Sequence, residues 1–452
     1  MKKIFVVSIL LGVIATFSTS AMAVDVKFSG EYYVAGMYQD KTTFKKDTAS
    51  DGPSTAFYYQ RLRLMTEIVV APGIILKTRA DIMERAWGAN RSTPGTAFDQ
   101  LSAGTRAENE NIVFDLAYLN YYSPIGIFSA GYIIDGNWGT TFADNSIPVG
   151  KVSWIFVNKG LVAGLQTGKN NGGEMSYSAI NSSTASDRDS SFYTAFVKYS
   201  FKNGEAGFLA KYIRMAGNRS VIPPDNGYLT GGVALIPYAK FTVGPLFVQA
   251  EVDYAWGQAA KWEGSTAPYN RLNDTRLEQW AGWLDATANF SKAYVGGTIA
   301  YVQGDDPGTG TAESGVLTGG MDWNPCLIMF NSDRSYWAGS IAGYGASANA
   351  GAMTNAWFFQ VRGGLKPIDK LDIMASVSYA NADKKPTANW LYNDYGWEVD
   401  LTATYKITNN LSYMLGGAYL FTGKYFKGEG SSTSPCDLTN NYMLIHKLTL
   451  TF

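Results

Sequence analysis

Charged residues recur at every second position in several short stretches of this sequence, a spacing that could bind ions and orient polar solutes. The mostly basic set comprises Arg61, Arg63, Glu67, Lys77, Arg79, Asp81 and Arg85. The acidic set comprises Glu251, Asp253, Asp285, Glu398 and Asp400, with Arg362 between its members in sequence. Because side chains alternate between the two faces of a β-strand, each stretch presents its charges on one face. A basic wall opposite an acidic wall would orient polar solutes, whereas neighbouring charges could instead close into local ion pairs.

The sequence offers little of what an enzyme needs. His446 is the single histidine, and its parity groups it with Leu448, Leu450 and Phe452 rather than with a serine. A Ser–His pair is therefore not indicated, and no phosphate-binding glycine loop or other cofactor motif occurs. Two cysteines and one histidine cannot supply four zinc ligands. We expect no enzymatic activity, no cofactor and no metal site.

The two cysteines, Cys326 and Cys436, fall in two long polar connections. Two are too few for a disulfide scaffold. Outside the cytoplasm they could form one disulfide that ties the largest connection to the last one. They could equally remain separate thiols, because the sequence does not fix the distance between their Cα atoms.

The stretches that carry the charges alternate strictly between apolar and polar residues. In 246–256, Val248 and Val252 share one face, whereas Glu251 and Asp253 share the other. A soluble β-sandwich also alternates in this way. Full charges along the polar face, however, require water on that side. The alternation therefore predicts strands with an apolar outer face and a wetted inner face.

Eighteen such strands are predicted, joined by alternately short and long connections. They cover 24–38, 56–70, 74–86, 111–122, 127–135, 148–157, 161–168, 191–201, 206–215, 230–242, 246–256, 278–290, 294–303, 356–365, 371–381, 393–407, 411–422 and 441–452. The short connections are rich in Gly, Pro and Asn, as tight hairpins demand. This plan predicts an all-β transmembrane antiparallel β-barrel with short periplasmic turns and long extracellular loops. Sixteen strands is the alternative if one hairpin is misread.

The composition supports a barrel in lipid. The 452 residues include 48 Gly, 29 Tyr, 23 Phe and 12 Trp, and no convincing amphipathic helix occurs among them. The chain is rich in aromatic residues and glycine but only mildly apolar. This composition suits a barrel with an apolar outer surface and a hydrated interior. A net charge of −1 gives no basic footprint for nucleic acid.

The two ends predict export and assembly. Lys2-Lys3 precedes an apolar run over 4–17, and Ala21-Met22-Ala23 follows. This is the order of a cleaved signal peptide, and the run is short for a membrane anchor, the other interpretation. We expect removal of 1–23, which leaves one barrel domain over 24–452. The alternating end at Phe452 resembles the C-terminal signal read by the barrel-assembly machinery of bacterial outer membranes.

Two connections are candidates to narrow the lumen, because a barrel of this size otherwise encloses an open channel. The segment 135–144 is short, rich in glycine and aromatic. The largest loop, 304–355, contains the run Cys326 to Phe330, which is too apolar to extend into water. We expect this loop to act as a lid or constriction, or else to bury itself as a stabilising cap.

Several short motifs resemble the alginate-export-like porins of Gram-negative bacteria. They are Tyr59-Gln60-Arg61-Leu62-Arg63-Leu64, Lys77-Thr78-Arg79, Ala117-Tyr118, Gly131-Tyr132, Trp138-Gly139-Thr140 and Phe142-Ala143-Asp144. The resemblance implies an eighteen-strand barrel whose arginine-lined lumen passes anionic solutes. Arg61, Arg63, Lys77, Arg79 and Arg362 could supply that lining.

These observations together predict a porin-like channel for small hydrophilic or ionic solutes in the bacterial outer membrane. The expected surroundings are outer-membrane lipid and lipopolysaccharide, and the barrel could be a homotrimer or a monomer. Two other functions fit the same fold. One is the sheath of an assembly that holds a partner protein inside the barrel, and the other is a surface receptor or adhesin that uses its loops.

Overall fold

The structure is a computed structural model, and it describes most of the chain. The described residues are 25–46, 52–88, 112–170, 187–219, 227–263, 273–429 and 436–452. The expected signal peptide over 1–23 lies outside these residues, as do parts of several long connections.

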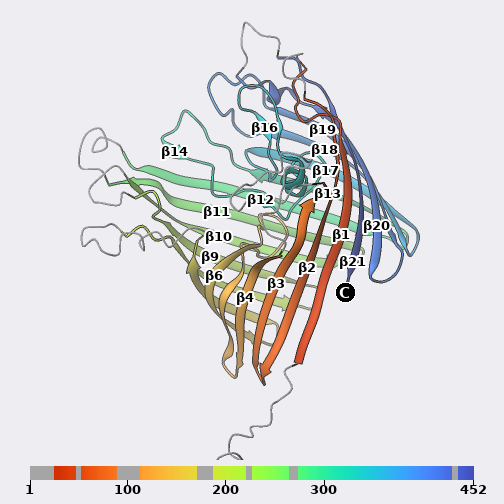
Figure 1. Cartoon of the computed structure of the whole chain (residues 1–452). Coiled ribbons are helices and arrows are strands. Elements are labelled where there is room, and N and C mark those ends of the chain that lie inside the picture. The colour runs from red at the N-terminus through yellow and green to blue at the C-terminus, as the bar shows by residue number, and fades with distance from the viewer. Residues whose placement is uncertain are drawn as a thin grey trace, which may run out of the picture.

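Eighteen long antiparallel strands form one closed barrel (Figure 1). They are β1 (Asp25–Gln39), β2 (Thr55–Ala71), β3 (Ile74–Ala86), β4 (Ile112–Ser123), β5 (Gly126–Asp135), β6 (Ile147–Asn158), β7 (Leu161–Lys169), β8 (Ser191–Phe201), β9 (Gly204–Met215), β10 (Tyr228–Val243), β11 (Leu246–Trp262), β12 (Thr275–Asn289), β13 (Ala293–Val302), β17 (Ala356–Ile368), β18 (Leu371–Ala382), β19 (Asp394–Lys406), β20 (Leu411–Thr422) and β21 (Asn441–Thr451). The prediction of eighteen strands is confirmed, and the sixteen-strand alternative is excluded.

The barrel closes where the first and last strands pair. β1 and β21 are antiparallel from Glu31 opposite Thr451 to Gln39 opposite Met443. Next to the Glu31–Thr451 pair, the backbones of Gly30 and Phe452 exchange two hydrogen bonds, of 2.8 and 3.1 Å. Closure leaves no edge strand with unpaired backbone groups, which a membrane interior would penalise.

Local turn chemistry sets the tight hairpins. Lys159 and Gly160 join β6 to β7, and both have positive φ, 44° and 87°. Two central residues of positive φ make the type I′ turn, whose twist matches that of the flanking strands. Pro72-Gly73 joins β2 to β3, with Gly73 at a φ of 77°. The residue types that favour such turns lie within the turns themselves, so the positions of the turns can be predicted from the sequence.

The outer face of the barrel is apolar. On β11, outward Val252 is 45% exposed, whereas the next residue inward, Asp253, is fully buried. Aromatic rings cluster on the same outer face, where Tyr254 stacks on Trp280 with ring centroids 4.1 Å apart. An apolar belt with aromatic clusters is the surface that a β-barrel presents to lipid. Among the described residues, no helix is long and apolar enough to cross a membrane.

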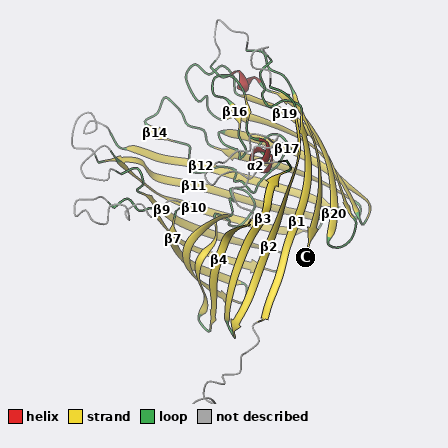
Figure 2. Cartoon of the chain, viewed as in Figure 1, coloured by secondary structure: helices red, strands yellow, loops and turns green. Residues whose placement is uncertain are grey.

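Two loops fold into the barrel. The large inward loop (304–355) contains β14 (Thr311–Ala312), α2 (Ser332–Ala338), β15 (Ile341–Ala342) and β16 (Ala348–Asn349), and Figure 2 shows α2 enclosed by the strands. Its apolar run from Cys326 to Phe330 packs against the inner wall, as the sequence predicts, and both Ile328 and Met329 are almost fully buried. The small inward loop (136–146) reaches β11, where its Thr140 bonds to Glu251.

Candidate functional site: the inner wall of the barrel

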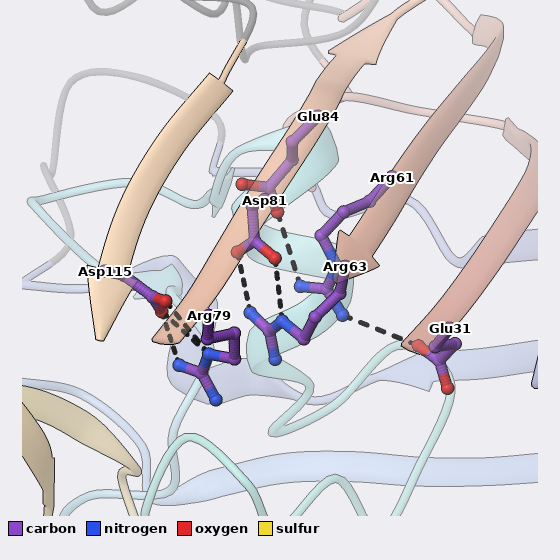
Figure 3. Close-up of polar contacts among 7 residues, drawn as sticks. All are labelled: Glu31, Arg61, Arg63, Arg79, Asp81, Glu84 and Asp115. Carbon is purple, nitrogen blue, oxygen red and sulfur yellow. Dashed lines mark hydrogen bonds and ion pairs between the residues drawn. The ribbon is translucent and has the colours of Figure 1, made fainter. Parts of the chain in front are cut away.

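Bidentate ion pairs hold the arginines of β2 and β3. Arg63 donates from Nε and Nη2 to the two carboxylate oxygens of Asp81, at 2.7 Å each. Arg79 donates from Nε to both oxygens of Asp115 at 3.0 Å, and a second bond from its Nη2 makes this pair bidentate too. Figure 3 shows these guanidinium groups pointing to the same side of the sheet as their carboxylates. Fork-to-fork pairs of this kind fix both side chains in the lumen wall.

The remaining cations of this wall are also paired. Arg61 lies 3.4 Å from a carboxylate oxygen of Glu84 and 3.6 Å from one of Glu31 (Figure 3). Lys77 forms an ion pair with Glu67. Arg61, Arg63, Lys77 and Arg79 therefore lie together on the inner wall, but as a ladder of local pairs rather than as an open basic surface. Arg85 was predicted to belong to this set and does not. It lies opposite Gln60, past a register shift in the β2–β3 ladder, and so on the other face of the sheet from Arg61.

Strand register explains the pairing. Arg63 lies directly opposite Asp81, and Lys77 directly opposite Glu67, in the antiparallel β2–β3 ladder. Asp115 is the extra residue where the β3–β4 register shifts beside Arg79, and such a bulge re-aims a side chain. Sequence reasoning missed the acids Glu31, Glu84 and Asp115 as partners. Glu31 could have been predicted as one of these partners, because the two-residue alternation of the first strand places its side chain on the inner face.

A further paired arginine, Arg362, lies on β17. The Arg362 guanidinium contacts both carboxylate oxygens of Asp285, at 2.7 and 2.9 Å, and the hydroxyls of Thr287 and Thr298. It crosses the intervening strand above Gly296, where an added Cβ would come within 3.0 Å of the Arg362 Cζ. Glycine at this position therefore lets the guanidinium lie flat against the wall.

The acidic set does not face lumen water, contrary to the expected acidic wall. Glu398 is fully buried, and its two oxygens accept the backbone N–H groups of Ile328 and Met329 at 2.6 and 2.7 Å. Asp400 is 3% exposed and accepts a bond of 3.2 Å from the Ser376 hydroxyl. The large inward loop covers both carboxyl groups, so their role in this structure is to hold the loop.

The other two acids lie under the small inward loop. Glu251 accepts two bonds from Thr140, one from its backbone N–H at 3.1 Å and one from its hydroxyl at 2.9 Å. Asp253 is fully buried, and neither of its oxygens finds a hydrogen-bond donor among the described residues. Strand parity predicts that these side chains point inward, but it cannot show that a loop covers them.

No disulfide joins Cys326 to Cys436 in the structure. Cys326, in the large inward loop, is buried against the wall beside the two covered acids of β19. Its Sγ and carboxylate oxygens of Glu398 and Asp400 lie within 4.8 Å of one another, a spacing that could hold a metal ion. Backbone amides already occupy both oxygens of Glu398, so hydrogen bonds account for that side chain without a metal.

The inner faces of β4 to β10, the Glu251 side chain of β11 and the small inward loop border a cavity of 450 Å³. Its wall includes Lys151 and Lys211, which share the carboxylate of Asp135 at 3.1 and 2.5 Å. Sequence reasoning did not single out these residues. Lys151 and Ser153 alternate on one face of 147–158, so the same two-residue spacing could have drawn attention to them.

The small inward loop is pinned to the wall beside this cavity. Trp138 donates from Nε1 to the Ile236 carbonyl at 3.0 Å, and Lys240 donates to the Gly139 carbonyl at 2.9 Å. Within the loop, the Asp144 carboxylate accepts the Trp138 backbone N–H at 2.6 Å. Burial raises the pKa of Asp144 to about 7, although that N–H bond opposes the shift.

Comparison with known proteins gives the fold. No protein-family model and no curated protein matches the chain. Among solved structures it aligns with Pseudomonas aeruginosa OccK2 (OpdF) at a TM-score of 0.52 and 10% identity, over 95% of this chain and 98% of that one. P. aeruginosa OccK9 (OpdG) gives 0.51 and 12%, over 95% and 99%, and Acinetobacter baumannii OccAB2 gives 0.50 and 11%, over 94% and 98%. At these identities the similarity establishes a shared barrel fold along almost the whole chain.

Proposed function

We propose that this chain forms an outer-membrane channel through which small hydrophilic or ionic solutes diffuse. The observation that carries the proposal is the division of each strand into an apolar outer face and a charged inner face. The side chains of Arg61 and Arg63 remain 20% and 25% exposed on the inner wall. Water therefore reaches that wall, and a closed barrel of this size with a wet interior is the architecture of a diffusion channel.

The two inward loops would narrow this channel rather than close it. The large inward loop packs on the wall of β12 to β19 and on the ends of β1 and β2 near Gln39 and Tyr59. The small one packs on β10 and β11. The path left between them runs along the paired ladder of β2 to β4 and past the cavity of β4 to β10. In this proposal Arg61, Arg63, Lys77, Arg79 and Asp81 line the path. Asp285 and Arg362 brace the wall, and Glu251, Glu398 and Asp400 position the loops.

Two alternatives fit the structure less well. A sheath for a partner protein needs an open lumen, whereas the large inward loop fills part of it with an apolar core that includes Ile328, Met329 and Trp337. A channel for anionic polymers, as the alginate-export-like resemblance implies, needs unpaired positive charge. Carboxylates already bind Arg61, Arg63, Lys77, Arg79 and Arg362. The pairing therefore favours small solutes over a polyanion.

The proposal includes export and assembly. Removal of 1–23 would release the mature barrel, and the barrel-assembly machinery would read the strand that ends at Phe452. The apolar outer belt would contact outer-membrane lipid and lipopolysaccharide, in a monomer or a homotrimer. Cross-linking in native membranes separates these two states.

Conductance of the refolded mature protein in a planar bilayer tests the channel. Discrete and stable single-channel steps are expected, with a conductance that grows with salt concentration. Silence from protein whose circular dichroism and heat-modified gel mobility show a folded barrel would contradict the proposal. It would favour the receptor function instead.

A further inference from the structure

The cavity of 450 Å³ between β4 to β10 and the small inward loop is large enough for a small-molecule site. Its lining is a mixture of aromatic rings, neutral hydrogen-bonding groups and charges. The question is which class of solute such a lining would hold.

We propose that this cavity binds a neutral polyhydroxylated solute of monosaccharide size while that solute crosses the barrel. The inference rests on the proposed channel function, and it adds a substrate class and a binding site to it. Three observations carry it: the state of the charges, the unused neutral groups and the position of one indole ring.

Both lysines of the cavity wall are bonded to the carboxylate of Asp135. Lys151 is 8% exposed, and it donates to the Ile134 carbonyl at 2.6 Å, to Asp135 at 3.1 Å and to the Gln166 carbonyl oxygen at 3.4 Å. An ammonium group has three donors, so none remains for a solute. Lys211 binds the other oxygen of Asp135 at 2.5 Å. A solute anion would therefore compete with a carboxylate that both lysines hold.

Neutral groups of the wall, by contrast, have hydrogen-bonding capacity left. The Thr194 hydroxyl is buried and finds no partner among the described residues. Asn120 accepts the Ser129 hydroxyl at 2.7 Å, a bond that leaves the two N–H donors of the amide for other partners. Ser153, on the neighbouring inward face, is 5% exposed and lines the same space. Hydroxyl groups both donate and accept, so a polyol matches such a wall better than an anion, which only accepts.

The small inward loop adds a fixed aromatic surface. Trp138 lines the cavity, and its Nε1 is bonded to the Ile236 carbonyl at 3.0 Å. The indole packs beside Phe196, with ring centroids 5.2 Å apart. It also lies over Gly207, where a Cβ would come within 2.9 Å of the Trp138 Cζ2. An immobilised ring offers the apolar C–H face of a sugar a contact that loses little side-chain entropy.

The test combines single-channel recording with ligand-observed NMR on the detergent-folded mature barrel. The probes are glucose and the anion gluconate, the open-chain acid formed when glucose is oxidised. Glucose is expected to interrupt the ion current in a concentration-dependent way and to give saturation-transfer signals. Gluconate is expected to do both more weakly. Stronger interruption and stronger signals with gluconate would overturn the assignment in favour of a carboxylate site.

Variants locate the site. The double variant Ser153→Ala/Thr194→Val removes two neutral hydroxyls, and glucose binding is expected to weaken about tenfold. Thr402→Val makes the same kind of change on inward-facing β19, outside the cavity, and should leave glucose binding unaffected. Equal binding by both variants would overturn the proposed site.

The two proposals can fail separately. A barrel that conducts ions but gives neither current block nor NMR signal with glucose refutes the solute class and leaves the channel standing. A barrel that gives NMR signals lost in Ser153→Ala/Thr194→Val, yet conducts nothing, refutes the channel and leaves the binding site standing.

Discussion

Two regions of the inner wall use their charged side chains in opposite ways. On β2 to β4 the charges bind one another across neighbouring strands, as Arg63 binds Asp81. On β12 to β19 the polar wall side chains bind the backbone of the large inward loop. Gln279 bonds to both backbone groups of Leu317, and Glu398 accepts two amide N–H groups. The first region is a lumen surface, and the second is a seat for a loop.

The difference between the regions is one of solvent rather than of residue type. The Arg63 side chain keeps a quarter of its surface exposed, whereas Glu398 has none. A partly wetted ion pair contributes at most about 1 kcal/mol. A buried carboxylate without donors would cost several times that amount, which is why Glu398 needs its two amides. Positions that face the interior of the barrel are therefore polar in both regions. Whether such a side chain forms an ion pair in water or binds a loop depends on whether the loop covers it.

The largest effect of a substitution is expected where the large inward loop covers the wall. Glu398→Ala leaves the backbone amides of Ile328 and Met329 in the large inward loop without their acceptor. We expect the packed loop to lose about 3 kcal/mol. The single-channel conductance should rise, and limited proteolysis should cut within 304–355.

A matched change in the open region provides the control. Glu67→Gln removes a carboxylate that pairs with Lys77, in a side chain that is 40% exposed. Conductance and protease resistance should stay close to those of the unmodified protein. If both variants behaved alike, the division of the wall into a lumen surface and a loop seat would be wrong.

An intermediate effect is expected from the ladder itself. Arg61→Gln together with Arg63→Gln leaves Asp81, Glu84 and Glu31 without their guanidinium partners. The lumen surface then becomes more negative, and the cation-to-anion permeability ratio should rise about twofold, more at low salt. Reversal potentials across a salt gradient measure this shift.

Arg219→Gln is the control for that experiment. Arg219 pairs with Glu263 at 2.7 Å beyond the end of β9, away from the ladder. Its loss should leave the reversal potential nearly unchanged. An unchanged potential in the double variant as well would count against the ladder as the selective surface.

The strands could be predicted because their signals are local. Period-two alternation and turn residues such as Lys159-Gly160 act within a few positions, and the expected strand 161–168 differs from Leu161–Lys169 by one residue. The helix α2 was missed, although Asn331 caps it through a 2.7 Å bond to the Arg334 N–H and Gly339 ends it at a φ of 77°. Seven residues give too short a pattern for periodicity to be read.

The candidate site could be predicted only in part. That Arg63 and Glu398 point inward follows from parity, and the Arg63–Asp81 pair would follow from the hairpin register. Burial of the acids could not be foreseen, because Glu398 meets Ile328 across 70 positions of sequence. The descent of an apolar run into the lumen was foreseeable, but the strand on which it lands was not.

The smallest effect is expected where the small inward loop borders the open region. Burial, with the charge of Asp322 adding to it, raises the pKa of Asp144 from 3.8 to about 7, against the opposing effects of the Trp138 N–H bond and Lys240. A carboxyl group whose pKa is raised on folding favours the packed loop fully below about pH 4, and this contribution is lost as pH rises to about 7. Loop-dependent current noise should therefore increase between about pH 4 and pH 7. Asp144→Asn keeps an acceptor for Trp138 but cannot ionise, so the current noise of this variant should not change with pH.

Asp322→Asn removes the neighbouring charge and should move the transition in current noise to lower pH. If Asp144→Asn and the unmodified protein gave the same pH profile, the noise would come from another group.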